Sequence, residues 1–141
     1  MRILGIDYGE ARTGLAISDE GEQIATAVGT LHERDKARLA ERIAAFCTER
    51  GVQKIVLGLP KNMDGTEGFR AEATRRFAAL LAERMSGCPI CFTDERLTSM
   101  MAARFLEETN TRGKKKKNAI DALSAEIILQ DYLDGARQGV L

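Results

Sequence analysis

Apolar and polar residues alternate in a way that divides the 141-residue chain into short strands at its start and helices later. Residues 2–6 form a compact apolar run, which predicts a buried strand ending just before Asp7. Residues 13–18 and 23–31 predict two further strands, separated by the tight turn Asp19-Glu20-Gly21. We therefore expect the chain to open with an antiparallel meander of three strands.

The period then changes to that of helices separated by short strands. The elements are predicted, in order, as a helix over 35–50 stopped by Gly51, a strand over 54–57, a helix from 69 to about 87, a strand over 90–93, a helix over 97–107, a basic loop over 109–117 and a helix from 118 to about 133. Strands alternating with helices require parallel pairing through right-handed crossovers. We expect an α/β fold in which the first strand occupies the centre of a five-stranded mixed sheet.

Length and composition indicate an ordinary globular protein of one domain spanning residues 1–141, with 44% apolar and 30% charged residues. No apolar run approaches the roughly 20 residues that span a bilayer, and the start lacks the pattern of a secretory signal. A cytoplasmic location is expected. The cysteines number three, and Cys88 and Cys91 lead into a strand, so we interpret them as buried apolar residues without a disulfide or zinc.

Two carboxylates follow predicted strands at what should be the same edge of the sheet. Asp7 ends the first strand, and Glu95 lies just beyond the strand over 90–93. Ligands of such sheets bind beyond the carboxyl ends of the parallel strands. Asp7 could instead be a turn residue that binds backbone amides, and Glu95 a first-turn acid of a helix. Asp94 is the competing candidate for the second acid, because neighbouring strand residues point to opposite faces.

A third acid, Asp121, begins the last predicted helix. It lies on one helical stripe with Ala125, Ile128 and Tyr132, which suggests that it faces inward from the first turn. The alternative is an Asn118 N-cap followed by an acid three residues later. Three carboxylates from separate elements would form a hard-oxygen site for Mg²⁺ or Mn²⁺, and two such ions can catalyse phosphodiester hydrolysis.

Four sequence blocks resemble the YqgF-type family of bacterial RNase H-like proteins, described as Holliday-junction resolvases and as pre-16S rRNA nucleases. The blocks are DYGEARTG from Asp7, GLPKNMDGTEG over 58–68, DERLTS over 94–99 and DALSA from Asp121. They run in family order along essentially the whole chain. One departure is Ala11, where the family usually has a basic residue before Arg12.

The resemblance implies that Asp7, Glu95 and Asp121 are metal-binding catalytic acids of a cytoplasmic enzyme, monomeric or dimeric, that matures ribosomal RNA. No fourth carboxylate ligand can be named. The candidate contacts to nucleic acid are Arg12, Lys61, Asn62, Arg96, Thr98, Lys114, Lys115, Lys116 and Lys117. The lysine run precedes Asp121 directly, so we expect it at the rim of the site. In the loop over 58–68, Asn62 and Gly65 permit positive φ, and the amides of 66–68 could bind a phosphate.

Other functions remain open on the sequence alone. The Asp7-x-Gly9 turn also resembles the phosphate-binding turn of actin and sugar kinases, but those proteins need a second domain around the nucleotide. A non-catalytic nucleic-acid-binding module would keep the acids as structural residues. RNA is the favoured substrate and branched DNA the alternative, since a junction resolvase should be a two-fold dimer. The few aromatic residues predict no platform for stacking bases.

Overall fold

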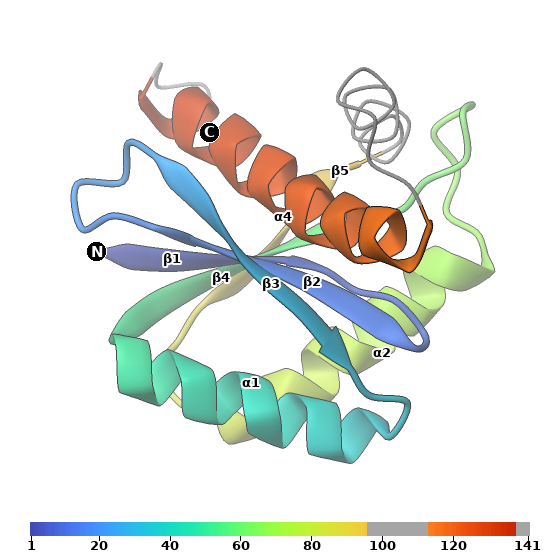
Figure 1. Ribbon diagram of the computed structural model, residues 1–141, viewed down its shortest axis with the longest axis horizontal. Coiled ribbons are helices and arrows are strands. Elements are labelled where there is room, and N and C mark those ends of the chain that lie inside the picture. The colour runs from blue at the N-terminus through green and yellow to red at the C-terminus, as the bar shows by residue number, and fades with distance from the viewer. Residues whose placement is uncertain (96–112, 138–141) are drawn as a thin grey trace.

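The computed structural model describes residues 1–95 and 113–137, and the side chains of 113–118, 136 and 137 lie outside this description. The predicted helix over 97–107 therefore lies outside the described residues, as do Arg96 and Thr98. The described elements are β1 (Arg2–Asp7), β2 (Arg12–Ser18), β3 (Ala25–His32), α1 (Lys36–Arg50), β4 (Val52–Leu59), α2 (Phe69–Arg84), β5 (Ile90–Asp94) and α4 (Gly113–Arg137) (Figure 1).

The described strands form one five-stranded mixed sheet in the order β3-β2-β1-β4-β5, which confirms the predicted topology. The central strand β1 pairs antiparallel with β2 and parallel with β4, and β5 pairs parallel with β4. The register sets Asp7 opposite Gly14 and Leu59 opposite Asp94. The carboxyl ends of β1, β4 and β5 thus lie at one edge of the sheet, where the two predicted acids were expected.

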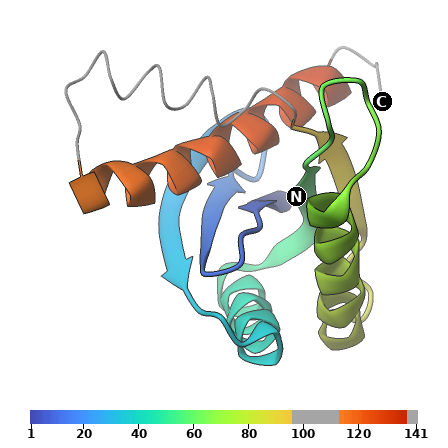
Figure 2. The same cartoon turned by 90° about the vertical axis from the view of Figure 1, so that its right-hand side faces the viewer.

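Helices cover both faces of the sheet, α4 on one side and α1 with α2 on the other (Figures 1 and 2). The inner strands are apolar on both faces, because both are buried. One core cluster includes Leu4, Ile6, Leu39, Ile55, Phe77 and Leu81, and the other includes Ile3, Val56, Ala125, Ile128, Leu129 and Leu133. No helix in residues 1–95 or 113–137 is long and apolar enough to cross a membrane.

The ends of α1 follow the local sequence closely. The Asp35 side chain caps the helix by accepting the Arg38 N–H at 3.1 Å, and Gly51 ends it with φ of 69°. A left-handed residue at this position favours glycine, which has no side chain to clash. The predicted start and stop of this helix are both confirmed.

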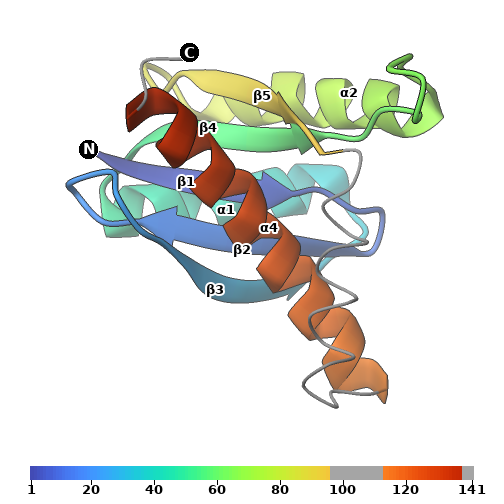
Figure 3. The same cartoon turned by 90° about the horizontal axis from the view of Figure 1, so that it is seen from above.

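The start of α4 differs from the prediction. The helix begins at Gly113 rather than Asn118, so Lys114–Lys117 occupy its first turns instead of a loop, and Asn118 does not cap it. Lysine is a good helix former, and residues 114–134 contain neither proline nor glycine, so nothing interrupts the helix there. Its first turns project past the sheet on the side of β3 (Figures 2 and 3).

Glycines let the backbone of α4 lie directly on the sheet. A Cβ added at Gly14 of β2 would meet the Asp121 carbonyl oxygen at 1.9 Å, and one at Gly5 of β1 would meet the Leu129 Cβ at 2.7 Å. No other residue type could accept the contact at Gly14 without moving the helix. Asp121 is therefore held beside the strand that pairs with the end of β1.

Candidate active site at the carboxyl edge of the sheet

Asp7 and Glu95 meet in a side-chain hydrogen bond where β1 and β5 end. The Glu95 N–H donates to the Leu59 carbonyl at 3.3 Å, which continues the β4–β5 pairing by one residue. Glu95 is 8% exposed, whereas its neighbour Asp94 is exposed to solvent. Of the two candidates for the second acid, the structure places Glu95 beside Asp7.

Burial is the main influence on both carboxyls of this pair. It raises the pKa of Asp7 to about 6, against the opposing effect of the hydrogen bond with Glu95. Burial, and then the charge of Asp7, raise the pKa of Glu95 to about 8. Near neutral pH the pair therefore holds a proton, because two adjacent buried carboxylates cannot both ionise cheaply.

Asp121 lies near this pair but contacts a cation. Its Oδ2 is 3.1 Å from the Arg12 Nε, and its side chain is 15% exposed. This oxygen has no hydrogen-bond partner among the described residues, so the contact with Arg12 is an ion pair without hydrogen-bond geometry. The charge of Asp121 raises the pKa of Asp7, so the third acid acts electrostatically on one member of the pair.

The donor atoms suit a hard cation, although the three acids are not gathered around a single point. No group of three His, Cys, Asp or Glu side chains in residues 1–95 and 113–137 is close enough to hold one metal ion. However, the Oε2 of Glu95 and the Oδ2 of Asp121 are buried and have no hydrogen-bond partner among the described residues. Buried carboxylate oxygens left in this way fit Mg²⁺ or Mn²⁺, which prefer oxygen ligands.

Arg70 is a cation that the sequence analysis did not single out. It lies in the first turn of α2, and its charge lowers the pKa of both Asp7 and Glu95. Nothing in the local sequence distinguishes it from the other arginines of this helix. Only the parallel topology, which sets the start of α2 beside the end of β1, brings Arg70 to the acids.

The loop over 58–68 uses its polar residues to hold itself together. The Asn62 amide Nδ2 donates to the Thr66 Oγ1 at 2.9 Å, and the Thr66 N–H donates to the Asp64 Oδ1 at 3.0 Å. Gly65 has a φ of 90°, as predicted, but Asn62 does not adopt positive φ. The Thr66 amide is thus already occupied, and phosphate binding by this loop and by Lys61 stays a prediction.

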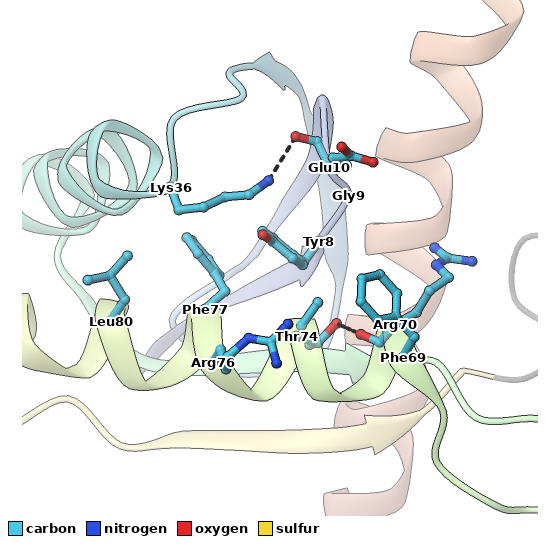
Figure 4. A pocket seen from close by; sticks show the side chains of 11 residues that line it. Tyr8, Gly9, Glu10, Lys36, Phe69, Arg70, Thr74, Arg76, Phe77 and Leu80 are labelled. Carbon is cyan, nitrogen blue, oxygen red and sulfur yellow. Dashed lines mark hydrogen bonds between the residues drawn. The ribbon is translucent and has the colours of Figure 1, made fainter.

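A cavity of about 640 Å³ lies between the turn after β1, the start of α1 and α2, and none of the three acids lines it (Figure 4). The rings of Tyr8 and Phe77 stack there with centroids 4.5 Å apart. Phe69, which also lines the cavity, is 77% exposed. Three aromatic residues thus gather at this cavity, but Tyr8 and Phe77 are buried against each other, so the absence of a platform for stacking bases stays a prediction.

Comparison with known sequences places residues 1–135 within the family model "RuvX: Holliday junction resolvase". A protein of Acetivibrio thermocellus named "Putative pre-16S rRNA nuclease" is 43% identical over 135 residues, covering 95% of this chain and 96% of its own. A protein of the same name from Limosilactobacillus fermentum is 46% identical over 137 residues, covering 95% and 94%.

Solved structures share the fold at much lower sequence identity. Thermus thermophilus RuvC aligns with a TM-score of 0.62 at 14% identity, covering 99% of this chain and 98% of its own. The fowlpox virus resolvase in complex with Holliday junction DNA aligns with a TM-score of 0.56 at 9% identity, covering 96% and 99%. These similarities confirm the RNase H-like fold that the sequence blocks implied.

Proposed function

Because this chain belongs to the RuvX family over residues 1–135, we propose that it is a metal-dependent endonuclease that hydrolyses phosphodiester bonds in the 5′ end of pre-16S rRNA. The observation that carries the proposal is the buried Asp7–Glu95 pair at the carboxyl edge of the sheet, with an oxygen of Glu95 left without a partner. A carboxylate pair so costly to bury is retained where it does chemistry.

In this proposal Asp7, Glu95 and Asp121 hold Mg²⁺ or Mn²⁺, because these ions prefer oxygen ligands such as carboxylates. Two such ions, when bound, would activate a water molecule and neutralise charge on the reacting phosphate. The chain's own contribution is to release the proton shared by Asp7 and Glu95, so that both become anionic ligands. Asp121 must also exchange its contact with Arg12 for the cation.

Arg12 and Arg70 are the described cations beside the acids, and we assign to them the positioning of the substrate phosphates. Arg12 is 37% exposed and can turn toward solvent when a bound metal ion, instead of Arg12, neutralises the charge of Asp121. A guanidinium can bind a phosphate through two parallel N–H donors, which fixes its orientation as well as its charge. Lys114–Lys117 add positive charge to the projecting first turns of α4, where a longer substrate would pass.

The choice of RNA rests on the names of the relatives that are 43–46% identical. Cleavage of four-way DNA is the second candidate, and the family description and the fold shared with the resolvases favour it. A resolvase would need a two-fold pair of chains with two sites. A binding module without catalysis would leave the buried, unpartnered oxygen of Glu95 without a role.

The test offers purified protein a precursor rRNA 5′ end, unstructured RNA and a four-way DNA junction, each with Mg²⁺, Mn²⁺ or a chelator. We expect metal-dependent cutting of the precursor by the wild type and none by Asp7→Asn. Preferred cutting of the junction would transfer the proposal to the second candidate. If the protein binds nucleic acid equally with and without chelator and cuts no substrate, the result would favour a non-catalytic binding module.

A further inference from the structure

The cavity between the turn after β1 and α2 has an apolar floor and an exposed aromatic residue at its edge. Tyr8 is 8% exposed and Phe77 is 2% exposed, and their rings form a buried floor in which each ring stacks on the other. Phe69 stands at one end of the cavity (Figure 4), and this residue is 77% exposed. The cavity has a volume of about 640 Å³, which lies within the roughly 300–1,000 Å³ of sites that bind small organic groups.

The rim of the cavity carries positive charge. Lys36, Arg70 and Arg76 line it, and Glu10 is the one carboxylate among its described lining residues. Lys36 lies over the ring of Tyr8, with its Nζ 5.1 Å from the centroid, and donates to the Glu10 carbonyl at 2.9 Å. An occupant with a flat apolar part and a negative part could stack on the exposed ring of Phe69 and meet the positive charge of the rim.

None of the three acids lines the cavity, and the chain at Tyr8 and the side chain of Arg70 connect it to them. Tyr8 follows Asp7 directly in the chain, and Arg70 both lines the cavity and acts electrostatically on Asp7 and Glu95. A chain molecule whose phosphate reached Asp7 would therefore set its next unit at the mouth of this cavity. To enter the cavity, that next unit must have a flat ring that can unstack from the adjacent units of its own chain.

We propose that this cavity binds an unpaired nucleobase next to the cleaved phosphodiester, with the adjoining phosphates on Arg70 and Arg76. The inference rests on the proposed nuclease function and deepens it, because it assigns single-stranded nucleic acid as the class of substrate. A base held in a duplex cannot enter, since its faces are covered by the stack. Stacking on aromatic side chains accepts every base, so the site selects strandedness rather than sequence.

Two substitutions at exposed residues test the cavity without touching the acids. Phe69→Ser removes the free ring, and Ile24→Ser is its control, because Ile24 is 63% exposed and does not line the cavity. Arg76→Gln removes a rim charge, and Arg50→Gln makes the same change in net charge at the last residue of α1. Circular dichroism should show that all four variants are folded.

Binding is measured by fluorescence anisotropy in EDTA, so that no cleavage intervenes. The probes are a labelled eight-nucleotide RNA, the DNA of the same sequence, the RNA with abasic central positions, and its blunt duplex. We expect the wild type to bind the intact single strands about tenfold more tightly than the abasic strand or the duplex. Phe69→Ser and Arg76→Gln should abolish that preference, and the two controls should keep it.

Equal affinity for intact and abasic strands, or for strand and duplex, would overturn the inference, as would absence of binding to any single strand. A preference that survives in Phe69→Ser and Arg76→Gln would also overturn it. Cleavage assays with Mn²⁺ on the same preparations separate the two proposals. If the protein cuts nucleic acid but binds intact and abasic strands equally, only the inference about the cavity is contradicted. If it prefers intact strands but cuts no substrate, only the proposed nuclease activity is contradicted.

Discussion

The Arg12 Nε lies 3.1 Å from the Asp121 Oδ2, joining β2 to α4 beside the end of β1. The same guanidinium is 37% exposed, so it could also receive a substrate phosphate. Arg12 thus has two possible anionic partners, the third acid of the site and the phosphate. A metal ion that takes Asp121 would free Arg12 for the substrate.

This relationship predicts that Arg12→Gln separates metal binding from substrate binding. Removing the cation eliminates a competitor for Asp121, so Mn²⁺ affinity measured by calorimetry should not fall. Cleavage should fall by roughly 10- to 100-fold, since a hydrogen bond to a charged group contributes about 1.5–3 kcal/mol. Arg34→Gln, at an exposed position, should change neither quantity. Loss of Mn²⁺ binding in Arg12→Gln would contradict this role.

Asp7→Asn should abolish cleavage and yet stabilise the metal-free protein. The amide keeps the shape of the carboxyl but removes a buried negative charge whose pKa is raised by burial. At pH 8 the free energy of unfolding should rise by about 1–3 kcal/mol, given 1.36 kcal/mol per pKa unit. Mn²⁺ should raise the Tm of the wild type and not that of the variant. A variant less stable than the metal-free wild type at pH 8 would contradict the account.

The raised pKa values also fix the sign of the pH dependence. Asp7 and Glu95 bind protons more tightly in the folded than in the unfolded protein, so folding takes up protons between their unfolded and folded pKa values. Stability contributed by the pair is therefore complete below about pH 4 and is lost as the pH rises to about 8. Urea unfolding of wild type and Asp7→Asn should give a difference that grows from pH 4 to pH 8. A constant difference would exclude the shared proton.

Gly58→Ala should disturb Glu95 through packing alone. A Cβ at this position would lie 2.5 Å from the Ile128 Cδ1 and 2.6 Å from the Glu95 Oε2. We expect a loss of about 1–3 kcal/mol in stability, as for other overpacked sites, together with weaker Mn²⁺ binding. Gly5→Ala is the control, because its Cβ would press on Leu129 and leave Glu95 untouched. It should reduce stability with little change in Mn²⁺ affinity, and equal effects on affinity would refute the positioning role of Gly58.

The order of the strands and the edge at which Asp7 and Glu95 meet could be predicted, because both depend on rules of connection. Period-two and period-3.6 patterns fixed the elements, and parallel pairing then left few topologies. The start of α4 could not be predicted in this way. The polarity of Lys114–Lys117 resembles that of a loop, whereas the helix there is held by backbone hydrogen bonds and needs no apolar face.

The cavity could not be predicted because its walls come from three separate elements. Tyr8, Lys36 and Phe69 have no common period and no motif that links them. The role of Arg70 has the same origin, since its effect on Asp7 depends on where α2 begins in space. Packing between elements, rather than any local pattern, creates these parts of the site.

The contact between Gly14 and the Asp121 carbonyl divides α4 into two parts with unequal freedom to change length. Each residue of an α-helix turns the chain by about 100°. An insertion after Asp121 would rotate Ala125, Ile128 and Leu129 out of the core, whereas one before it would only lengthen the projecting lysine turns. Related chains should therefore vary in length ahead of Asp121 and keep a constant spacing behind it, with the glycine of β2 as the reference point for both.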